Sequence, residues 1–408
     1  MRALQPALDA LVVAGNGASP RVLKDAGAKE ADLLLAVTEI DEVNLLAAAA
    51  GHRLGVQRTL ARVRDAEWFG GDQGFARDIL GVDAVIDPEH ATADDLAETL
   101  LLPGAVHVEH FAEGAITVAE IVIREHSPLA GVVVRERPEP VPYSIVGILR
   151  GGAVLVPTAG ERVQPGDRVF AVASQEQIAQ VVAFLDGAPE EVRDVVVLGG
   201  GRVGGHLAKR LAGRCDVRVL ERDAERARLL AERVPQALIL HEGDLSKEML
   251  LAHGVDRAGA FVACAGDDRT NLLATLHAKQ LGARLCLAVV TREQYVPLVD
   301  ALGVDGAFSL RLTTAEAILR FVRVDTVRAM HLTISGAEVL DLNADPGSAI
   351  VGARAEPAGR LSGCEVGAIL RDGRVLIPAA GERIQAGDRV LLFRRRGTTA
   401  RVEHAFDA

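Results

Sequence analysis

The stretch VVVLGGGRVGGHLAKRL, residues 195–211, carries the strongest fold signal in this 408-residue chain. An uninterrupted apolar run ends in glycines at 199, 201 and 204, and a helical pattern follows them. A second apolar run, DVRVLE, ends at Glu221, about twenty residues beyond the turn. This order is typical of the strand, glycine turn and helix that begin a Rossmann domain. The motif lies in the middle of the chain, so the first half needs its own explanation.

Each glycine of this turn has a separate expected role. Gly199 permits the tight turn, Gly201 lets the backbone approach a pyrophosphate, and Gly204 lets helix and strand pack closely. The free N–H groups and the partial positive charge at the helix start favour phosphates. Glu221 is expected to bind a ribose diol and to repel a 2′-phosphate, which favours NAD over NADP. ADP and ATP carry the same ribose and stay alternatives, as does a glycine turn that only packs a helix.

Two more loops are expected at the same sheet edge. In open parallel sheets, ligands bind at the carboxyl ends of the strands. The apolar runs ALIL and AFVAC end just before HEGD and AGDD. This pattern predicts Gly243 and Asp244 near an adenine, and Ala265 and Gly266 at the next strand end.

The α/β unit around these loops occurs twice in the chain. AGAKEADLLLAVTEIDEVNLLAAAAGHRLGVQRTLARVRDAEW aligns without a gap on HGVDRAGAFVACAGDDRTNLLATLHAKQLGARLCLAVVTREQY. The first copy predicts strands at 32–37 and 59–63 and a helix at 39–54, hence a parallel, doubly wound sheet. Asp268 is expected to cap the helix after its strand, with Asn271 in the first turn, and a ligand contact is the alternative for both.

A smaller unit is also duplicated. ILRGGAVLVPTAGERVQPGDRVFAVA begins at Ile148, and ILRDGRVLIPAAGERIQAGDRVLLFR begins at Ile369. Gly151-Gly152 between two β runs indicates a hairpin in a small α+β domain. The fold class is therefore α/β, with two Rossmann-like parallel-sheet domains alternating with two small α+β domains. The expected domains span residues 1–104, 105–188, 191–323 and 324–408.

The first Rossmann unit begins too late to contain a glycine turn. Gly15-Asn16 corresponds to Gly243-Asp244, so residues 1–14 replace roughly 195–242 of the second copy. LQPALDALVVAGNG aligns with the second helix and third strand of that copy. The unit is therefore expected to be truncated, either in nature or by a misplaced start codon. Loss of the central first strand would expose sheet edges, which favours the misplaced start codon.

Composition excludes several function classes. The net charge of −11 and 3% aromatic residues argue against nucleic-acid binding. No apolar run is long enough to span a bilayer and no signal peptide is evident, so a cytosolic protein is expected, with any membrane role through a partner. No catalytic triad, P-loop or metal-ligand spacing is present, which predicts neither an enzyme nor a metal site. The four cysteines are expected to be small buried hydrophobic residues: Cys215, Cys264, Cys286 and Cys364.

The alternating layout and its motifs resemble the TrkA family, the cytosolic subunits of bacterial Trk potassium transporters, built from tandem RCK (KTN) domains. The resemblance covers nearly the whole chain. It is carried by GNGASPRVLKDAGAKEADLLLAVTEIDEVN, ARVRDAEW, GGGRVGGHLAKRL, LERD and the two stretches of the RVLIPAAGERIQAGDRV type. The Rossmann-like units would then be RCK-N domains and the small units RCK-C domains.

This resemblance implies a gating role rather than catalysis. Such proteins bind NAD(H) or adenine nucleotides and assemble as dimers or tetramer rings beneath a TrkH- or TrkG-type membrane subunit, on the inner face of the cell membrane. Ligand-dependent ring geometry would alter potassium flux. An NAD-dependent oxidoreductase and an RCK-type regulator of another cation transporter are the alternatives.

The resemblance also assigns nucleotide-binding residues. In the second Rossmann unit they are Gly199, Gly200, Gly201, Arg202, Val203, Glu221, Ala265 and Gly266. In the first unit the family's strand-end threonine, its following residue and its arginine match Thr38, Glu39 and Arg62. Val289 stands where the first copy has Arg62, so that phosphate contact is in doubt in the second copy. Without a glycine turn, the three residues of the first copy would form half a site.

Overall fold

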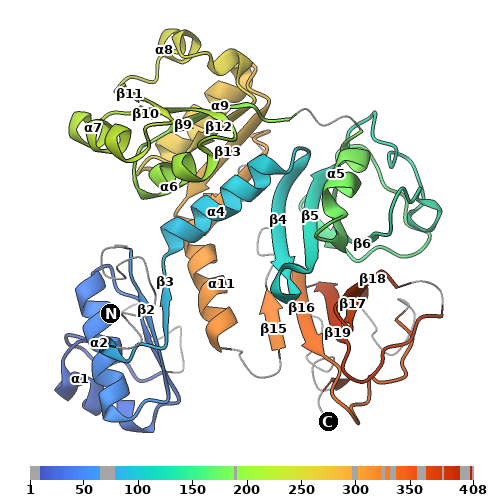
Figure 1. The fold of residues 1–408 in the computed structure, drawn as a ribbon, viewed down its shortest axis with the longest axis horizontal. Coiled ribbons are helices and arrows are strands. Elements are labelled where there is room, and N and C mark those ends of the chain that lie inside the picture. Colours follow the sequence, from blue (N-terminus) through green and yellow to red (C-terminus); the bar gives the residue numbers. More distant parts are fainter. Residues whose placement is uncertain are drawn as a thin grey trace. The chain divides into compact units, whose positions relative to one another are not determined.

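The computed structural model describes most of the chain (Figure 1). The chain divides into two compact units, which are described separately here. Unit 1 contains residues 1–91 and 313–322, and unit 2 contains residues 92–312 and 323–408. The described residues are 10–64, 79–187, 191–295, 302–322, 327–330, 337–355, 364–378, 381–395 and 405–406.

A six-stranded parallel sheet forms the Rossmann fold of unit 2, in the order β11-β10-β9-β12-β13-β14. The valine-rich β9 lies in the middle, between β10 and β12, and Val195–Leu198 are buried. A strand covered on both faces needs a continuous apolar run, which explains VVVL. The strands are β9 (Asp194–Leu198), β10 (Asp216–Glu221), β11 (Leu238–His241), β12 (Ala260–Ala263), β13 (Leu285–Val290) and β14 (Gly306–Ser309).

Helices cover both faces of this sheet, as the predicted doubly wound fold requires. Val195 and Val197 belong to the hydrophobic cluster that contains α6, whereas Val196 and Leu198 belong to the cluster that contains α9. Alternate residues of one strand point to opposite faces, so a single apolar run supplies both cores. The helices are α6 (Arg202–Leu211), α7 (Ala224–Arg233), α8 (Lys247–Ala252) and α9 (Asp268–Leu281).

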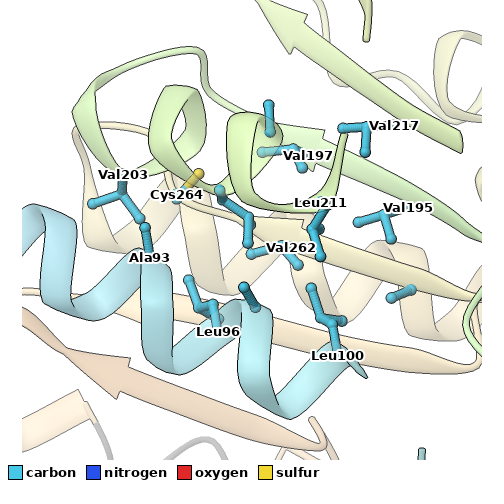
Figure 2. Packing of buried hydrophobic residues seen from close by; sticks show 14 of the residues in the cluster. Ala93, Leu96, Leu100, Val195, Val197, Val203, Leu211, Val217, Val262 and Cys264 are labelled. Atoms are coloured by element: carbon cyan, nitrogen blue, oxygen red, sulfur yellow. The ribbon is translucent and has the colours of Figure 1, made fainter. Parts of the chain in front are cut away.

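One further helix in this core comes from the first half of the sequence. Helix α4 (Pro88–Leu101) places buried alanines and leucines against β9, β12 and α6 (Figure 2). Leu96 and Leu100 are at most 1% exposed. Burying each leucine is worth about 2 kcal/mol. The second Rossmann core therefore depends on residues that precede its first strand by about a hundred positions in the sequence.

Two five-stranded antiparallel sheets form the small domains of unit 2. Their orders, β4-β5-β8-β6-β7 and β15-β16-β19-β17-β18, are the same pattern in the two repeats. Gly151 and Gly152 turn the predicted hairpin with φ of 56° and 80°, values that suit a type I′ turn. The strands of the first sheet are β4 (Ala105–Phe111), β5 (Ile116–Val122), β6 (Ser144–Arg150), β7 (Ala153–Leu155) and β8 (Arg168–Ser174). Those of the second are β15 (Val327–Met330), β16 (Ala337–Asn343), β17 (Cys364–Arg371), β18 (Arg374–Leu376) and β19 (Arg389–Arg395).

The repeat extends to individual ion pairs. Arg150 donates to both oxygens of the buried Asp167 at 2.8 Å, and Arg371 makes the same two bonds to Asp388 at 2.8 Å. Two-pronged arginine–carboxylate pairs of this kind fix orientation as well as charge. The same two arginines also donate to Glu161 and Glu382 of the GER stretches, so a shared structural network explains the duplicated GER and GDR stretches.

The two small sheets share one hydrophobic cluster. Phe111, Val146 and Phe170 from the first pack with Leu391 and Phe393 from the second. A Cβ added at Gly147 would lie 2.3 Å from a ring carbon of Phe393, so the glycine permits this close approach. Helix α5 (Ile178–Asp186) packs on the first sheet. The small domains therefore form a single packed body within unit 2.

Unit 1 contains a three-stranded parallel sheet in the order β1-β2-β3 among its described residues. Helices α1 (Pro20–Asp25) and α2 (Asp41–Leu54) accompany β1 (Leu33–Ala36), β2 (Arg58–Arg62) and β3 (Ala84–Ile86). These elements confirm the predicted strands and helix to within two residues at each end. The last ten residues of α11 (Leu310–Val322) join this unit, where the Arg58 guanidinium donates to the carbonyls of Phe321 and Val322.

The predicted third strand of the first copy is wrong for its described part. Residues 11–14 form no strand, and Leu11 is 79% exposed. In the second copy the corresponding strand, β11, pairs with β10. No equivalent of β10 lies among the described residues of unit 1, so this apolar run lacks the strand with which its counterpart pairs. Residues 1–9 of the same prediction lie outside the described residues. Separately, no helix in the described part of the chain is long and apolar enough to cross a membrane.

Candidate functional site

The glycine turn connects β9 to α6. Gly199 has a φ of 101°, and a Cβ there would lie 2.8 Å from the backbone nitrogen of Ala265. A Cβ at Gly204 would lie 1.9 Å from the carbonyl oxygen of Gly199. Both positions therefore require glycine for backbone conformation and close packing, in agreement with the expectation for these two residues.

Gly201 differs from its two neighbours in the motif. It is the N-cap residue of α6 with a φ of −67°, and an added Cβ would meet nothing within 4 Å. Folding alone therefore does not demand glycine here, and the space in front of the backbone is open. The first N–H groups of α6 have no acceptor within the helix. This opening fits a phosphate group, which a helix start binds through backbone N–H groups.

The two residues after Gly201 contribute differently to the turn. Val203 is buried in the core with α4 and α6, so its side chain packs inward. Arg202 is exposed at the first position of the helix. Of these predicted residues, Val203 can therefore offer only its backbone to a ligand.

Glu221 ends β10 beside the turn and has a structural role that the sequence did not predict. Its carboxylate accepts hydrogen bonds from the Gly200 N–H at 2.7 Å and the Asp223 N–H at 2.8 Å. Arg226 lies 3.3 Å from the same carboxylate, which is only 5% exposed. Glu221 therefore fixes the glycine turn, and any bond to a ribose would use its remaining lone pairs.

The remaining predicted residues of the second Rossmann unit lie in loops at the same edge of its sheet. Because the strands are parallel, the loops after β9, β10, β11 and β12 all leave from the carboxyl ends. Gly243 and Gly266 have open space where a Cβ would be. A hydrogen bond from the Ser246 side chain lowers the pKa of the Asp244 carboxyl, which also accepts from the Ser246 N–H. The structure thus gathers the predicted residues of the second copy along one edge.

Ala265 is held by a buried asparagine. The Asn271 side chain accepts from the Ala265 N–H at 2.8 Å and donates to the carbonyls of Ala265 at 2.9 Å and Val289 at 2.8 Å. The structural interpretation of Asn271 is thus confirmed. The prediction for Asp268 is wrong in detail, because Asp267 is the N-cap residue and accepts from the Thr270 N–H. Asp268 instead accepts from the backbone N–H groups of residues 291 and 292, after β13.

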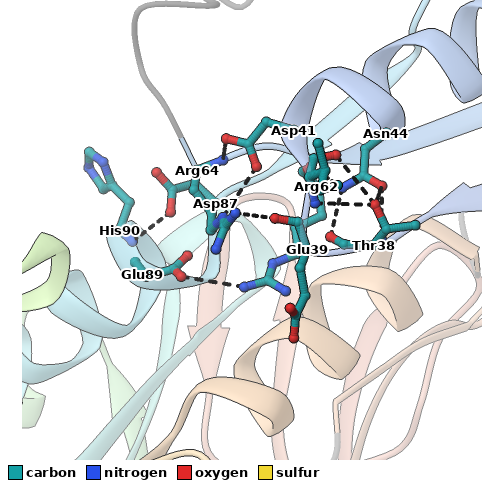
Figure 3. A network of polar contacts seen from close by, with 10 residues as sticks. Thr38, Glu39, Asp41, Asn44, Arg62, Arg64, Asp87, Glu89 and His90 are labelled. Carbon is teal, nitrogen blue, oxygen red and sulfur yellow. Dashed lines mark hydrogen bonds and ion pairs between the residues drawn. The ribbon is translucent and has the colours of Figure 1, made fainter. Parts of the chain in front are cut away.

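The first copy repeats this asparagine clamp (Figure 3). Asn44 accepts from the Thr38 N–H at 2.8 Å and donates to the carbonyls of Thr38 at 2.9 Å and Arg62 at 2.8 Å. Asp41 likewise accepts from the backbone N–H of Arg64 at 2.9 Å. The loop after β1 therefore has the geometry of the loop after β12, with Thr38 in the place of Ala265.

Arg62 and Glu39 lie near this clamp, in unit 1 (Figure 3). Arg62 pairs with Glu89 at 3.4 Å, and burial raises the pKa of Glu89. The Nε of Arg62 and the second carboxylate oxygen of Glu89 are buried without a hydrogen-bond partner among the described residues. The Glu39 carbonyl accepts from Arg64. The structure thus brings Thr38, Glu39 and Arg62 together, but in a different compact unit from the glycine turn.

The side chains that could act as a nucleophile or a base are held in inert states. Cys264 is buried beside Gly199, and burial raises its pKa to about 12. The other three cysteines are also free and buried, as predicted. Burial would lower the pKa of His107, but its hydrogen bond to Glu109 at 3.0 Å and the nearby carboxylates raise it to about 9. A thiolate nucleophile or a histidine base would need a pKa nearer to neutrality.

Two Rossmann-like units alternate along the chain with two small antiparallel sheets, and in fold this arrangement is similar to a solved RCK domain structure. A family profile described as the TrkA-N domain matches residues 2–88 and 195–310, and one described as the TrkA-C domain matches residues 118–186. The chain belongs to the Trk system potassium uptake protein TrkA family.

Curated relatives and solved structures agree with this assignment. The Trk system potassium uptake protein TrkA of Azorhizobium caulinodans is 32% identical, over 98% of this chain and 89% of its own length. The TrkA protein of Haemophilus influenzae is 31% identical, over 96% of this chain and 88% of its own. The structure titled "GsuK channel bound to NAD" covers all of this chain and 72% of its own, with a TM-score of 0.61 and 20% identity, a likeness in fold.

Proposed function

We propose that the chain is the nucleotide-binding regulatory subunit of a Trk-type potassium uptake system. The observation that carries this proposal is the open backbone at Gly201, where the fold alone would accept a larger residue. NAD(H) is the favoured ligand, because Glu221 at the end of β10 suits a ribose diol and disfavours a 2′-phosphate. ATP and ADP are the second candidates. The fold neighbour solved with NAD supports the same choice.

The proposed nucleotide site lies along the carboxyl edge of the second Rossmann sheet. Backbone groups of the glycine turn would bind the phosphates, Glu221 the ribose, and the loops after β11 and β12 the adenosine side. The proposed residues are Gly199, Gly200, Gly201, Arg202, Val203, Gly204, Glu221, Gly243, Asp244, Ala265 and Gly266, with Thr38, Glu39 and Arg62 as a partial site in the first copy. The proposed domain boundaries are 1–104, 105–188, 191–323 and 324–408.

The bound nucleotide would act as a signal rather than as a cosubstrate. Hydride transfer needs a proton donor and substrate clamps beside the cofactor. Glu221 already accepts from two backbone N–H groups, and the high pKa of Cys264 keeps its thiol protonated at neutral pH. These states favour a regulator over an NAD-dependent oxidoreductase.

Regulation would work through a membrane partner. We propose that the chain assembles as a dimer or tetramer ring and docks on a TrkH- or TrkG-type subunit at the inner face of the cell membrane. A nucleotide that binds one ring geometry better would shift the population toward that geometry and so change potassium flux. Family membership supports this arrangement, while a regulator of another cation transporter is the alternative.

Calorimetric titration of the full chain with NADH, NAD, ATP and ADP tests the ligand, and potassium flux through vesicles containing a TrkH-type subunit tests the role. The proposal expects saturable binding of at least one nucleotide and a flux that changes with that nucleotide. Absence of binding by all four would refute the nucleotide site. Binding without a change in flux would refute regulation of this partner, and turnover of NADH with a carbonyl substrate would support an oxidoreductase.

A further inference from the structure

A cavity of about 540 Å³ lies at the opposite edge of the second Rossmann sheet, against the first small domain. The sheet contributes residues at the amino ends of β9, β12, β13 and β14, and the small domain contributes the start of β4 and the ends of β5 and α5. This volume is within the usual range for small-molecule sites. The lining residues are Pro103, Gly104, Ala105, Val106, Val122, Arg124, His126, Asp186, Val192, Gly259, Lys279, Arg284, Leu285 and Asp305.

Positive charge exceeds negative charge in this cavity. Arg124, Lys279 and Arg284 oppose two carboxylates, Asp186 and Asp305, in a chain whose net charge is −11. Lys279 binds Asp305 tightly, at 2.7 Å. Arg124 is 56% exposed and lies 3.7 Å from Asp186, beyond hydrogen-bond distance. The Arg124 guanidinium can therefore turn toward an incoming anion without breaking a close bond to Asp186.

The internal repeat shows which cavity-lining residues both copies of the fold share and which occur in one copy alone. The Asp305 carboxylate accepts a hydrogen bond from the backbone N–H of Cys286. Its repeat counterpart, Asp83, accepts from the backbone N–H of Thr59 in the same way. The basic lining residues do not recur in this manner. Arg124, Lys279 and Arg284 align on Asp345, His52 and Gln57, respectively. Since the corresponding strands and helices form in the other copy without cations at these three positions, the scaffold alone does not explain Arg124, Lys279 and Arg284.

We propose that this cavity binds a small, multiply charged anion that carries phosphate or carboxylate groups. Guanidinium groups bind both kinds of oxyanion through paired hydrogen bonds, and a lysine adds a point charge. The anion would bridge the first small domain and the second Rossmann domain, and would favour the arrangement in which they form the cavity. This site is distinct from the proposed nucleotide site, which lies at the carboxyl ends of the same strands.

Calorimetric titration with pyrophosphate and with citrate tests the proposal and separates phosphate from carboxylate ligands. The full chain carrying Gly201→Asp is used, so that pyrophosphate does not bind at the glycine turn. Saturable binding of either probe is expected, weakened at least about tenfold by Arg124→Gln. Arg135→Gln is the matched control, because Arg135 lies on the same small domain, is 66% exposed and does not line the cavity.

Two outcomes would overturn the proposal. One is the absence of saturable binding of both probes up to about 10 mM, beyond the range of a specific weak site. The other is binding that Arg124→Gln and Arg284→Gln leave unchanged while circular dichroism reports a native fold. If Arg124→Gln does not fold, Arg284→Gln alone decides between the two results. Nucleotide binding by the Gly201→Asp chain tests the proposed function. Its loss does not affect the titrations of the cavity with pyrophosphate and citrate.

Discussion

Replacement of Gly201 by aspartate separates nucleotide binding from folding. Gly201 has a φ of −67°, which any residue adopts, and an added Cβ meets nothing within 4 Å. Aspartate is a preferred N-cap residue and should stabilise α6 by about 0.3 kcal/mol relative to glycine. The same carboxylate would stand where the proposed phosphates approach the helix. Gly201→Asp should therefore keep or slightly raise stability while removing nucleotide affinity.

The expected loss of affinity follows from charge repulsion. Two unit charges about 4 Å apart repel by about 4 kcal/mol at an effective dielectric constant near 20. A cost of that size lowers affinity roughly a thousandfold. The partial positive charge at the start of α6, which would favour a bound phosphate, would instead be satisfied by the new side chain.

Titration calorimetry with NADH and ATP, together with thermal unfolding in the absence of ligand, measures both effects. Gln236→Glu is the matched control: it adds the same charge at an exposed position just before β11, at the amino edge of the sheet. The control should bind like the wild type. A folded Gly201→Asp protein that binds within about threefold of the wild type would refute the assignment of the glycine turn, since repulsion predicts far more.

Three further substitutions test stability. Gly204→Ala should cost about 3 kcal/mol in urea unfolding, because its Cβ would lie 1.9 Å from the Gly199 carbonyl oxygen; a loss below about 1 kcal/mol would contradict the tight packing. Burial raises the pKa of Glu365 to about 7, so the contribution of its protonated form to wild-type stability should be full below pH 4.5 and be lost, by roughly 3 kcal/mol, as pH rises through 7. Glu365→Gln should flatten that part of the profile, and an unchanged slope would exclude Glu365 as its source. His107, with a pKa of about 9, should stabilise the fold below pH 6.5 and lose this effect as pH rises through 9; in His107→Asn the melting temperature should not fall over that interval.

The repeats made much of the fold predictable. Alignment of Gly27 on Gly254 and of Ile148 on Ile369 indicated two sheets of each kind, and the strand orders of the small sheets agree. Local periodicity was sufficient to predict the strands that have a neighbouring strand in the sheet and the helices that pack on them. It failed at residues 11–14, where the run is apolar but the described part of unit 1 offers no neighbouring strand.

The candidate site was predictable in position but not in detail. Spacing alone identified Gly199 and Gly204, whose roles are steric. The bond from the Gly200 N–H to Glu221 joins the turn after β9 to the end of β10, and no pattern within one strand encodes it. Asp267, whose backbone is still extended, is the helix cap, and two adjacent aspartates in a sequence do not show which of them ends the extended segment. The packing of α4 in the second Rossmann core could not be predicted from the sequence, because an amphipathic helix does not specify which sheet covers its apolar face.

The close packing of Gly147 on Phe393 has a consequence for synthesis of the chain. The first small sheet is complete once β8 has left the ribosome, yet the cluster around Phe170 also needs β17 and β19. At about 5–20 residues per second, that partner arrives on the order of ten seconds later. Until then the apolar face of the first sheet is open to water and to other chains. A product that stops before β19 should therefore aggregate through a surface that the finished protein never exposes.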